Sequence, residues 1–289
     1  MRVRLENGMK IHGHSRAEIR LLFDEIFNKK VYLKNGIELR ESDVVFDIGA
    51  NVGLFSLFVS ESLDDFKLFA FEPVQEICEC LRRNTRHLGE RAVILNAGVS
   101  DHLGQAVFTY YPRLPSLTTR FPDRLEGRWS DLKDVFVRPD APGAHVAGVL
   151  RGPRKRLLSW CVDGLLYYAS RSQEKICRLT SISSVIAEHG VERIDLLKID
   201  VEGSEGDVLR GIEESDWEKI RQLVIEVHDI EGGVDSLVGW LERRGLEVTI
   251  DSEHEGRKSP LHMLYARRAP EEAHATHAGG QRNGEGDHP

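Results

Sequence analysis

The sequence of 289 residues lacks the features that mark several large protein classes. No apolar run approaches the ~20 residues that a helix needs to cross a bilayer. A net charge of −8 argues against a general nucleic-acid surface, which would have to be basic. The first residues lack the apolar core of a signal peptide, and cysteine is limited to four residues. We therefore expect a cytoplasmic, reducing location and neither a membrane nor a nucleic-acid partner.

The remaining composition is that of an ordinary soluble globular protein with a sizeable core, at 40% apolar and 30% charged residues. Cys78 and Cys80 flank Glu79 in a stretch with helical periodicity, so they point to different faces. No C-x-x-C partner is present, and we expect buried or idle thiols rather than a metal pair.

The most informative stretch is residues 44–53, Val-Val-Phe-Asp-Ile-Gly-Ala-Asn-Val-Gly. Its short β-branched run indicates a strand buried on both faces. Apolar residues recur at helical spacing after Gly53, so the Gly-x-Asn-x-Gly turn joins this strand to a helix. Gly49 and Gly53 lack a Cβ and would let a ligand lie against the backbone. A second strand, residues 68–71, ends in Glu72, which is placed to bind ribose hydroxyls.

Two cofactor classes use a strand, a glycine turn and a helix in this order. A dinucleotide requires G-x-G-x-x-G around its pyrophosphate. Here Asn51 replaces the second glycine and Leu54 the third, and the carboxylate of Asp47 would repel a phosphate. The same carboxylate suits the ammonium and sulfonium charges of S-adenosylmethionine (SAM). An ordinary turn without a ligand is the alternative, because short motifs recur by chance. The predicted SAM-binding residues are Asp47, Gly49, Asn51, Gly53 and Glu72.

A third predicted strand, residues 92–96, ends in Asn96-Ala97-Gly98. Ligands collect at the carboxyl ends of parallel strands, so Asn96 and Gly98 are candidates to lie beside the adenine. A plain exit from the strand into a turn would give the same sequence.

Two later strands carry polar residues on apolar backgrounds. Residues 194–201 form one, and a period of two would place Lys198, Asp200 and Glu202 on one face. The next strand, residues 223–228, ends in Glu226 and His228, again two apart. Charges inside apolar strands are costly unless they are paired or used. Either a structural Lys–Asp pair or a functional cluster would explain them.

Three motifs, taken together and in this order, resemble the FkbM family of SAM-dependent methyltransferases. They are residues 47–53 (Asp-Ile-Gly-Ala-Asn-Val-Gly), 71–73 (Phe-Glu-Pro) and 197–203 (Leu-Lys-Ile-Asp-Val-Glu-Gly). Residues 24–27 and 108–112 are similar to the branch associated with polyketide and nonribosomal-peptide pathways.

The resemblance implies an α/β class I methyltransferase (Rossmann-like) fold, with a seven-stranded, mainly parallel sheet and helices on both faces. It also implies an O-methyltransferase that acts on a hydroxyl of a natural-product intermediate, free or bound to a carrier protein. A sugar hydroxyl as acceptor and a catalytically silent SAM-binding subunit are the alternatives. The polar residues on the two later strands argue against a silent subunit.

Methyl transfer to a hydroxyl requires an in-line acceptor and a base that removes its proton. Histidine is the natural base near neutral pH. We assign His228 as base, with Asp200 or Glu202 orienting it. A divalent cation held by these residues and Glu226 is an alternative, which we rank second.

Domain boundaries follow from composition. Residues 1–42 are predicted to be a strand and helix lead-in, with a capping box at 15–18. The resemblance suggests that this helix lies over the cofactor. Residues 43–269 are predicted to form the methyltransferase domain, and residues 270–289, which have no apolar residue larger than alanine, a disordered tail.

The predicted domain is interrupted by an insertion at residues 112–178, which is rich in proline and glycine. Residues 113–156 contain ten Lys/Arg and five Asp/Glu, a local charge of +5 in a chain of −8. The most basic run is residues 151–156. This stretch is either a loosely held solvated loop or a cap over the acceptor site that presents cations to an acidic acyl or peptidyl carrier protein.

Overall fold

The computed structural model of the chain describes residues 1–125, 170–228, 233–251 and 261–269. The predicted basic run at residues 151–156 and the predicted tail at 270–289 lie outside the described residues. At His228 the backbone is described and the side chain is not.

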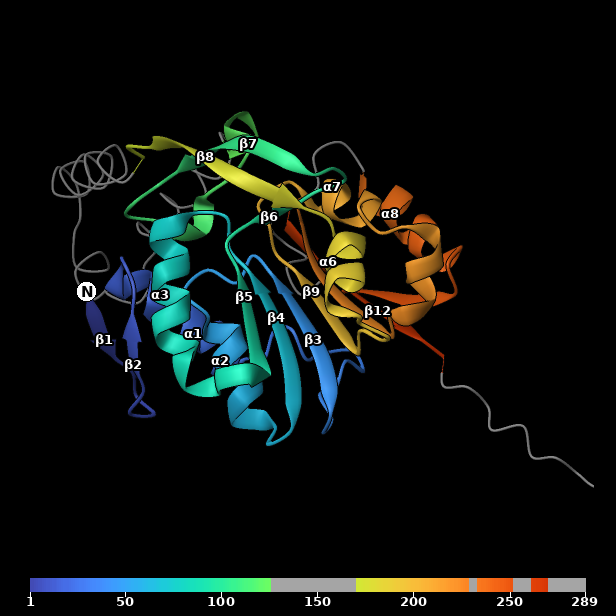
Figure 1. Cartoon of the computed structure of the whole chain (residues 1–289), viewed down its shortest axis with the longest axis horizontal. Coiled ribbons are helices and arrows are strands. Elements are labelled where there is room, and N and C mark those ends of the chain that lie inside the picture. The colour runs from blue at the N-terminus through green and yellow to red at the C-terminus, as the bar shows by residue number, and fades with distance from the viewer. Residues whose placement is uncertain (126–169, 229–232, 252–260, 270–289) are drawn as a thin grey trace, which may run out of the picture.

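A seven-stranded sheet runs through the middle of the molecule (Figure 1). Five of its strands are parallel, in the order β10 (Gln222–His228), β9 (Leu196–Ile199), β3 (Asp43–Ile48), β4 (Phe66–Phe71) and β5 (Ala92–Leu95). Beyond β10 the sheet continues with β12 (Leu261–Arg268) and β11 (Leu246–Asp251), both antiparallel to their neighbours. This topology confirms the predicted class I methyltransferase fold, and its last two strands form an antiparallel hairpin.

Helices cover both faces of the sheet (Figure 1). One face carries α1 (Arg16–Phe23), α2 (Leu54–Ser62) and α3 (Gln75–Thr85); the other carries α6 (Ile182–His189), α7 (Glu205–Arg210) and α8 (Gly233–Glu242). Neighbouring residues in β3 serve opposite cores: Val45 packs with α1 to α3, whereas Phe46 packs with α6 to α8. The apolar run of this strand is therefore explained by burial on both faces.

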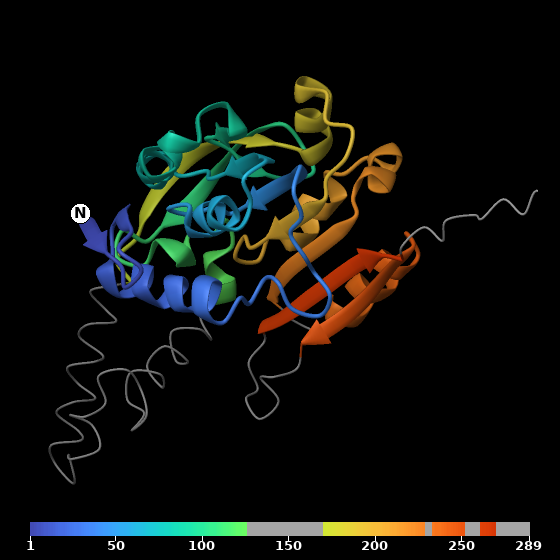
Figure 2. The same ribbon diagram turned by 90° about the horizontal axis from the view of Figure 1, so that it is seen from below.

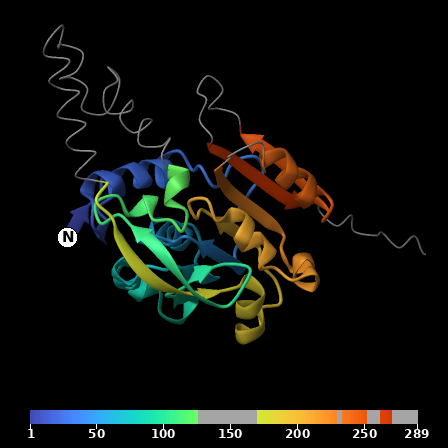
Figure 3. The ribbon, with the colours of Figure 1, turned by 90° about the horizontal axis from the view of Figure 1, so that it is seen from above.

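Two small sheets flank this core. β1 (Arg2–Arg4) and β2 (Lys10–His12) form an N-terminal hairpin. β6 (Gly98–Val99), β8 (Gln173–Thr180) and β7 (Gly104–Tyr110) form a three-stranded sheet, in which β8 lies between its partners. In the view from above, β7 (green) and β8 (yellow) lie across the molecule (Figure 3). Residues 173–178 of the predicted insertion thus belong to a regular strand.

Short helical turns complete the chain: the π-helical turn η1 (Asp24–Asn28) and the 3-10 turns η2 (Arg86–Arg91), η3 (Pro115–Leu117), η4 (Pro122–Leu125) and η5 (Glu214–Lys219). No helix in the described ranges is long and apolar enough to cross a membrane. Cys78 and Cys80 are free and buried, as predicted, and burial raises the pKa of the Cys78 thiol to about 11.

Helix ends follow their local signals. The Ser15 hydroxyl accepts a hydrogen bond from the Glu18 N–H at 3.4 Å, which makes half of the predicted capping box. The Ser181 hydroxyl caps α6 through the Ser184 N–H at 3.1 Å. Gly190 ends the same helix at φ +61°, a left-handed conformation that glycine adopts without strain.

The lead-in between α1 and β3 runs past the C-terminal hairpin (Figure 2). The Tyr265 hydroxyl on β12 donates to the Val31 carbonyl at 2.6 Å, and Lys34 Nζ lies 3.3 Å from Asp251 Oδ2 on β11. These contacts fix residues 29–37 against the sheet.

Candidate active site

The turn between β3 and α2 contains three residues with left-handed backbone: Gly49 (φ +77°), Asn51 (φ +49°) and Gly53 (φ +89°). A Cβ on Gly49 would lie 1.8 Å from the carbonyl oxygen of Asp200, and one on Gly53 would lie 2.6 Å from Leu81 Cδ1. Gly49 is therefore required by a backbone contact within the chain, and Gly53 is favoured by its positive φ, whereas the sequence had suggested a ligand as the reason. The turn is pressed directly against the end of β9.

Asn51 has a buried side-chain oxygen, Oδ1, that accepts no hydrogen bond from the described residues. Buried polar atoms are rarely left without a partner, so such an atom marks a place where a ligand donor fits. It lies in the turn that the sequence assigned to SAM. The geometry is thus suited to a ligand that brings an ammonium or hydroxyl donor to this turn.

Asp47, at the end of β3, is fully buried. Its Oδ2 accepts a hydrogen bond from the Ser56 hydroxyl at 2.8 Å, and Lys198 Nζ lies 3.1 Å from Oδ1 as an ion pair rather than a directed hydrogen bond. This pair was not predicted from the sequence, and it joins neighbouring strands, since Asp47 and Lys198 are register partners. The Asp47 carboxylate thus supports the glycine turn from the interior and does not itself reach the surface.

Lys198 extends this pair into a larger network. Its Nζ donates to the Gly49 carbonyl at 3.0 Å and lies 3.6 Å from Asp200 Oδ2. Burial alone would lower the pKa of Lys198, but the carboxylates of Asp47 and Asp200 outweigh it and raise the pKa above its ordinary value. The lysine is therefore a buried cation that ties the glycine turn to the end of β9.

Asp200 is the most open member of this network, with its side chain 21% exposed. Its Oδ2 also accepts a hydrogen bond from the Tyr32 hydroxyl at 2.8 Å. Sequence reasoning missed Tyr32, because a single aromatic in an extended segment gives no periodic signal. We call Asp47, Lys198, Asp200 and Tyr32 the buried network.

Glu202 does not continue the alternation that the sequence suggested. β9 ends at Ile199, and Glu202 adopts φ +53°, which is unusual for a residue with a side chain. Its side chain is buried near Glu18 of α1, and burial, with a contribution from Glu202, raises the pKa of Glu18 to about 7. The predicted common face therefore holds for Lys198 and Asp200, which contact each other.

Glu72, at the end of β4, is buried and accepts hydrogen bonds from the backbone N–H groups of Val74 (2.9 Å) and Asn51. Burial raises the pKa of Glu72 to about 7, against the effect of these two donors. The carboxyl thereby links the exit of β4 to the glycine turn. Its predicted ribose contact stays a prediction.

Asn96 and Gly98 follow β5. The Asn96 amide donates to the carbonyls of Glu72 and Pro73, both at 2.9 Å. Asn96 and Pro73 also line a cavity of about 350 Å³, together with Glu76 and Lys175. A Cβ on Gly98 would lie 2.8 Å from Phe108 Cζ, so packing against β7 explains this glycine. Asn96, but not Gly98, lines the cavity.

The end of β10 brings Glu226 and His228 to the same sheet edge. Val224 is the register partner of Lys198, and the negative charge of Glu226 acts on both Tyr32 and Lys198. His228 lies two residues further along the strand and pairs with Leu261 of β12. Its assignment as base stays a prediction, because its side chain lies outside what is described.

The metal alternative finds no support in the described part of the chain. No group of three or more His, Cys, Asp or Glu side chains is arranged there to hold a metal ion. The set proposed from sequence (Asp200, Glu202, Glu226 and His228) includes the undescribed His228 side chain, so the alternative remains to be tested by chelation.

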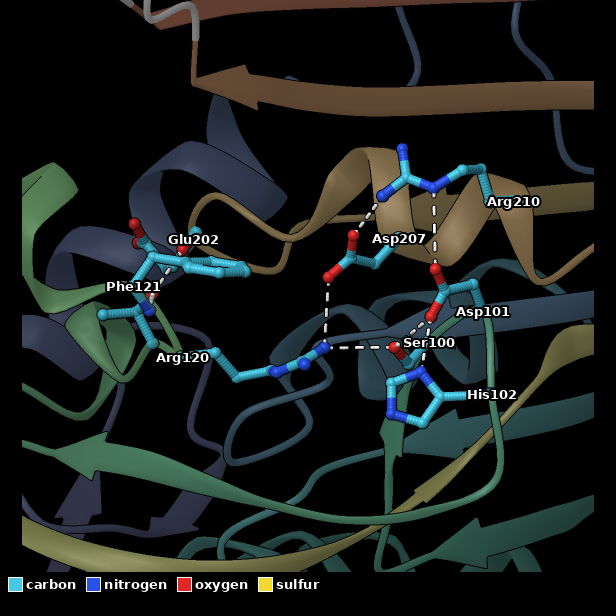
Figure 4. Close-up of polar contacts among 9 residues, drawn as sticks. Ser100, Asp101, His102, Arg120, Phe121, Glu202, Asp207 and Arg210 are labelled. Atoms are coloured by element: carbon cyan, nitrogen blue, oxygen red, sulfur yellow. Dashed lines mark hydrogen bonds and ion pairs between the residues drawn. The ribbon is translucent and has the colours of Figure 1, made fainter.

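A second charged cluster lies between the exit of β6, α7 and residues 111–121 (Figure 4). We call residues 111–121 the strap. Arg120 NH1 donates to the Ser100 hydroxyl at 3.0 Å and to Asp207 Oδ2 at 3.1 Å. Arg210 bridges Asp207 and Asp101. We call Asp101, Arg120, Asp207 and Arg210 the rim network.

The strap also makes hydrogen bonds to residues near the candidate active site. The Thr119 hydroxyl donates to the Glu202 carbonyl at 2.6 Å, and the Ser116 N–H donates to Glu18 Oε1 at 2.6 Å. The strap therefore spans from α1 to α7 across the turn that carries Glu202.

A larger hollow of about 750 Å³ lies elsewhere, at the amino ends of β9 and β10. It is lined by the end of α6 and by η5, including Gly190, Glu213 and Lys219. It contains none of the motif residues, and ligands of parallel sheets bind at the opposite, carboxyl edge. We therefore do not assign it to the site.

Comparisons with known proteins agree with this geometry. Residues 47–248 match the family described as "Methyltransferase FkbM domain". The chain is 34% identical over 267 residues to the 31-O-demethyl-FK506 methyltransferase FkbM of Streptomyces tacrolimicus, covering 92% of this chain and 96% of that protein. It is 35% identical over 257 residues to the AMB antimetabolite synthetase AmbE of Pseudomonas aeruginosa, covering 86% of this chain and 12% of the synthetase.

Among solved structures, magnesium protoporphyrin IX methyltransferase from Synechocystis PCC 6803 with bound SAM aligns at a TM-score of 0.42 and 10% identity, covering 88% of this chain and 83% of that one. The family match begins at Asp47 and so includes the glycine turn, Glu72 and the Asp200 motif. Tyr32 and Glu18 lie before it.

Proposed function

The chain belongs to the FkbM methyltransferase family and uses SAM as its methyl donor, and we propose that it methylates a hydroxyl group of a polyketide or nonribosomal-peptide intermediate. Two relatives support this acceptor class by their names, one a methyltransferase of 31-O-demethyl-FK506 and the other an antimetabolite synthetase. The observation that carries the proposal is Asp200, whose carboxylate is partly open and whose backbone carbonyl lies directly against the glycine turn.

The residues of the turn fit SAM. The buried Asn51 Oδ1 offers an acceptor to the ammonium group, and Gly49 and Gly53 keep the backbone of the turn in its left-handed form. Asp47 would hold the methionine portion indirectly, by fixing this turn through Lys198. Glu72 would face the ribose, and Asn96 the adenine, at the cavity that it lines. When bound, SAM supplies a methyl group on a positively charged sulfur.

The chain's own task is to orient the acceptor and to take its proton. When the acceptor oxygen takes the methyl group, the methyl–sulfur bond would break and leave a neutral thioether, and the imidazole of His228 would take the hydroxyl proton. Asp200 stabilises the resulting imidazolium. We assign this role to Asp200 rather than to Glu202 because the Asp200 side chain is partly exposed. The Glu202 side chain is buried beside Glu18. Positioning supplies most of the acceleration, and the base adds about 10²–10⁴-fold.

A carrier-bound acceptor is favoured by one observation. This chain matches a segment equal to 12% of a synthetase, so a related domain works inside a much larger chain. We infer that the hydroxyl is presented on an acyl or peptidyl carrier protein, and that the cationic residues 113–156 contribute to its docking.

The test is methyl transfer from labelled SAM to one 3-hydroxyacyl group, presented as a small thioester and on an acidic carrier protein. Transfer to the hydroxyl in either form supports O-methylation, and transfer on the carrier alone supports the docking proposal. Methylation of a different atom, or of sugar hydroxyls only, would contradict the acceptor class. SAM binding without transfer to any of these acceptors would favour a silent subunit.

A further inference from the structure

Tyr32 is held rigidly beside the site although it lies before the matched family domain. Its side chain is buried, and its ring meets the ring of Phe55 edge-on at 5.2 Å between centroids. The backbone next to it is fixed by the hydrogen bond from the Tyr265 hydroxyl to the Val31 carbonyl. The tyrosine is thus fixed in both its ring and its backbone.

The hydroxyl of Tyr32 acts on Asp200. It donates to Oδ2 at 2.8 Å, and Lys198 Nζ lies 3.6 Å from the same oxygen. The lysine ammonium also lies 5.2 Å from the centre of the Tyr32 ring. Because both contacts fall on Oδ2, the described residues leave the second oxygen of this partly exposed carboxylate for a further partner.

Tyr32 keeps its proton under all ordinary conditions. Burial, followed by the negative charges of Asp200 and Glu226, raises the pKa of Tyr32 well above its ordinary value. The hydroxyl is therefore a permanent donor. A carboxylate that accepts a hydrogen bond from a fixed donor is restricted in its rotation as well as stabilised in its charge.

We propose that Tyr32 is a positioning residue for methyl transfer, which holds Asp200 by Oδ2 so that Oδ1 is presented to the base or the acceptor. The inference rests on the proposed function, because the oriented carboxylate matters only if it serves the proton transfer. The proposal also gives the lead-in, residues 1–42, a role in methyl transfer through Tyr32.

The test compares Tyr32→Phe with Tyr110→Phe, which removes the hydroxyl of another buried tyrosine, on β7, whose ring meets that of His14. A hydrogen bond to a charged group is worth roughly 1.5–3 kcal/mol, so Tyr32→Phe is expected to lower kcat about 10- to 100-fold. SAM affinity and acceptor KM are expected to stay within about twofold, since the lost contact is to Asp200. Tyr110→Phe is expected to keep kcat within about threefold.

A double-mutant cycle then asks whether Tyr32 acts through Asp200. In an Asp200→Asn background, Tyr32→Phe is expected to cost less than about threefold, because the partner has already been altered. An undiminished loss in that background, or a wild-type kcat in Tyr32→Phe, would overturn the inference.

The methyl-transfer rate of the wild-type protein tests the proposed function. The ratios of kcat among the variants test whether Tyr32 positions Asp200. A measurement without an acceptor keeps the two apart. In crystal structures, the Asp200 carboxylate is expected to change its rotamer in Tyr32→Phe and to keep it in Tyr110→Phe. An unchanged Asp200 in both variants would exclude the positioning role even if the acceptor class proves wrong.

Discussion

The two charged networks of this chain both join segments that are far apart in the sequence, but they differ in depth. In the buried network, the side chains of Asp47, Lys198 and Asp200 are 0%, 3% and 21% exposed. In the rim network, those of Arg120 and Asp207 are 17% and 18% exposed, and that of Arg210 is 59% exposed.

The burial of a charged network determines how much the network contributes to the stability of the fold. Removing one member of a buried ion pair leaves an uncompensated charge and costs about 3–5 kcal/mol, whereas an exposed pair contributes about 0–1 kcal/mol. The buried network therefore defines the position of the glycine turn against β9. In the rim network the exposed Arg210 is expected to add little to stability, and the Arg120–Asp207 pair connects the strap to α7.

The largest expected effect tests whether the buried network serves chemistry. His228→Ala is expected to lower kcat by about 10²–10⁴-fold and to leave SAM affinity nearly unchanged, because the variant lacks the proposed base. The matched control is His262→Ala, the histidine on β12 paired with Val227. Single-turnover transfer and calorimetric SAM binding measure both effects. Unchanged turnover would remove His228 from the mechanism and leave Asp200 as the nearest candidate.

The second effect compares the two networks directly through one change made in each. Lys198→Met is expected to lower the free energy of unfolding by about 3–5 kcal/mol, because Asp47 stays buried without its cation. Arg210→Met at the rim is expected to cost less than about 1 kcal/mol. Denaturant unfolding of both variants provides the comparison. Equal losses would mean that depth does not separate these networks.

The sequence predicted the framework well because the signals there are local. Burial on both faces made β3 and β4 continuous apolar runs, and Ser15 marked a helix start that the structure confirms. The pairing of β6 and β7 with β8 was not predicted, because it joins residues about seventy positions apart.

The site was predicted in part. A period of two correctly brought Lys198 and Asp200 together, but it failed at Glu202, where the backbone turns to positive φ. Glu18 was expected to complete a capping box and instead accepts the Ser116 N–H, because a buried carboxylate takes whichever donor the tertiary structure supplies. Tyr32 gave no local signal at all.

The third prediction concerns Glu18, which holds the buried end of the strap. Its folded pKa, about 7, lies above the ordinary 4.5, so its contribution to stability is complete below pH 4.5 and is lost as the pH rises toward 7. Glu18→Gln stays neutral and is expected to gain about 3 kcal/mol relative to the wild type across this window. Unfolding curves at several pH values measure the difference.

The exposed Glu79→Gln serves as the control for Glu18→Gln and should show little such gain. Glu72 has a similarly raised pKa but is present in both the variant and the wild type, so its effect cancels in the comparison. A difference between Glu18→Gln and wild type that does not change with pH would mean that Glu18 is ionised in the folded protein.

The smallest expected effect is at the other end of the strap. Arg120→Ala removes the ion pair to Asp207 and the hydrogen bond to Ser100, and we expect a stability loss of about 1 kcal/mol. The strap should nevertheless become more accessible, measured as faster amide exchange over residues 115–121, while exchange in the glycine turn stays unchanged. A loss close to that of Lys198→Met would show that the rim network also carries the fold. Faster exchange at the glycine turn would show that the strap and the glycine turn open as one unit. The distinction between the rim network and the buried network would then fail.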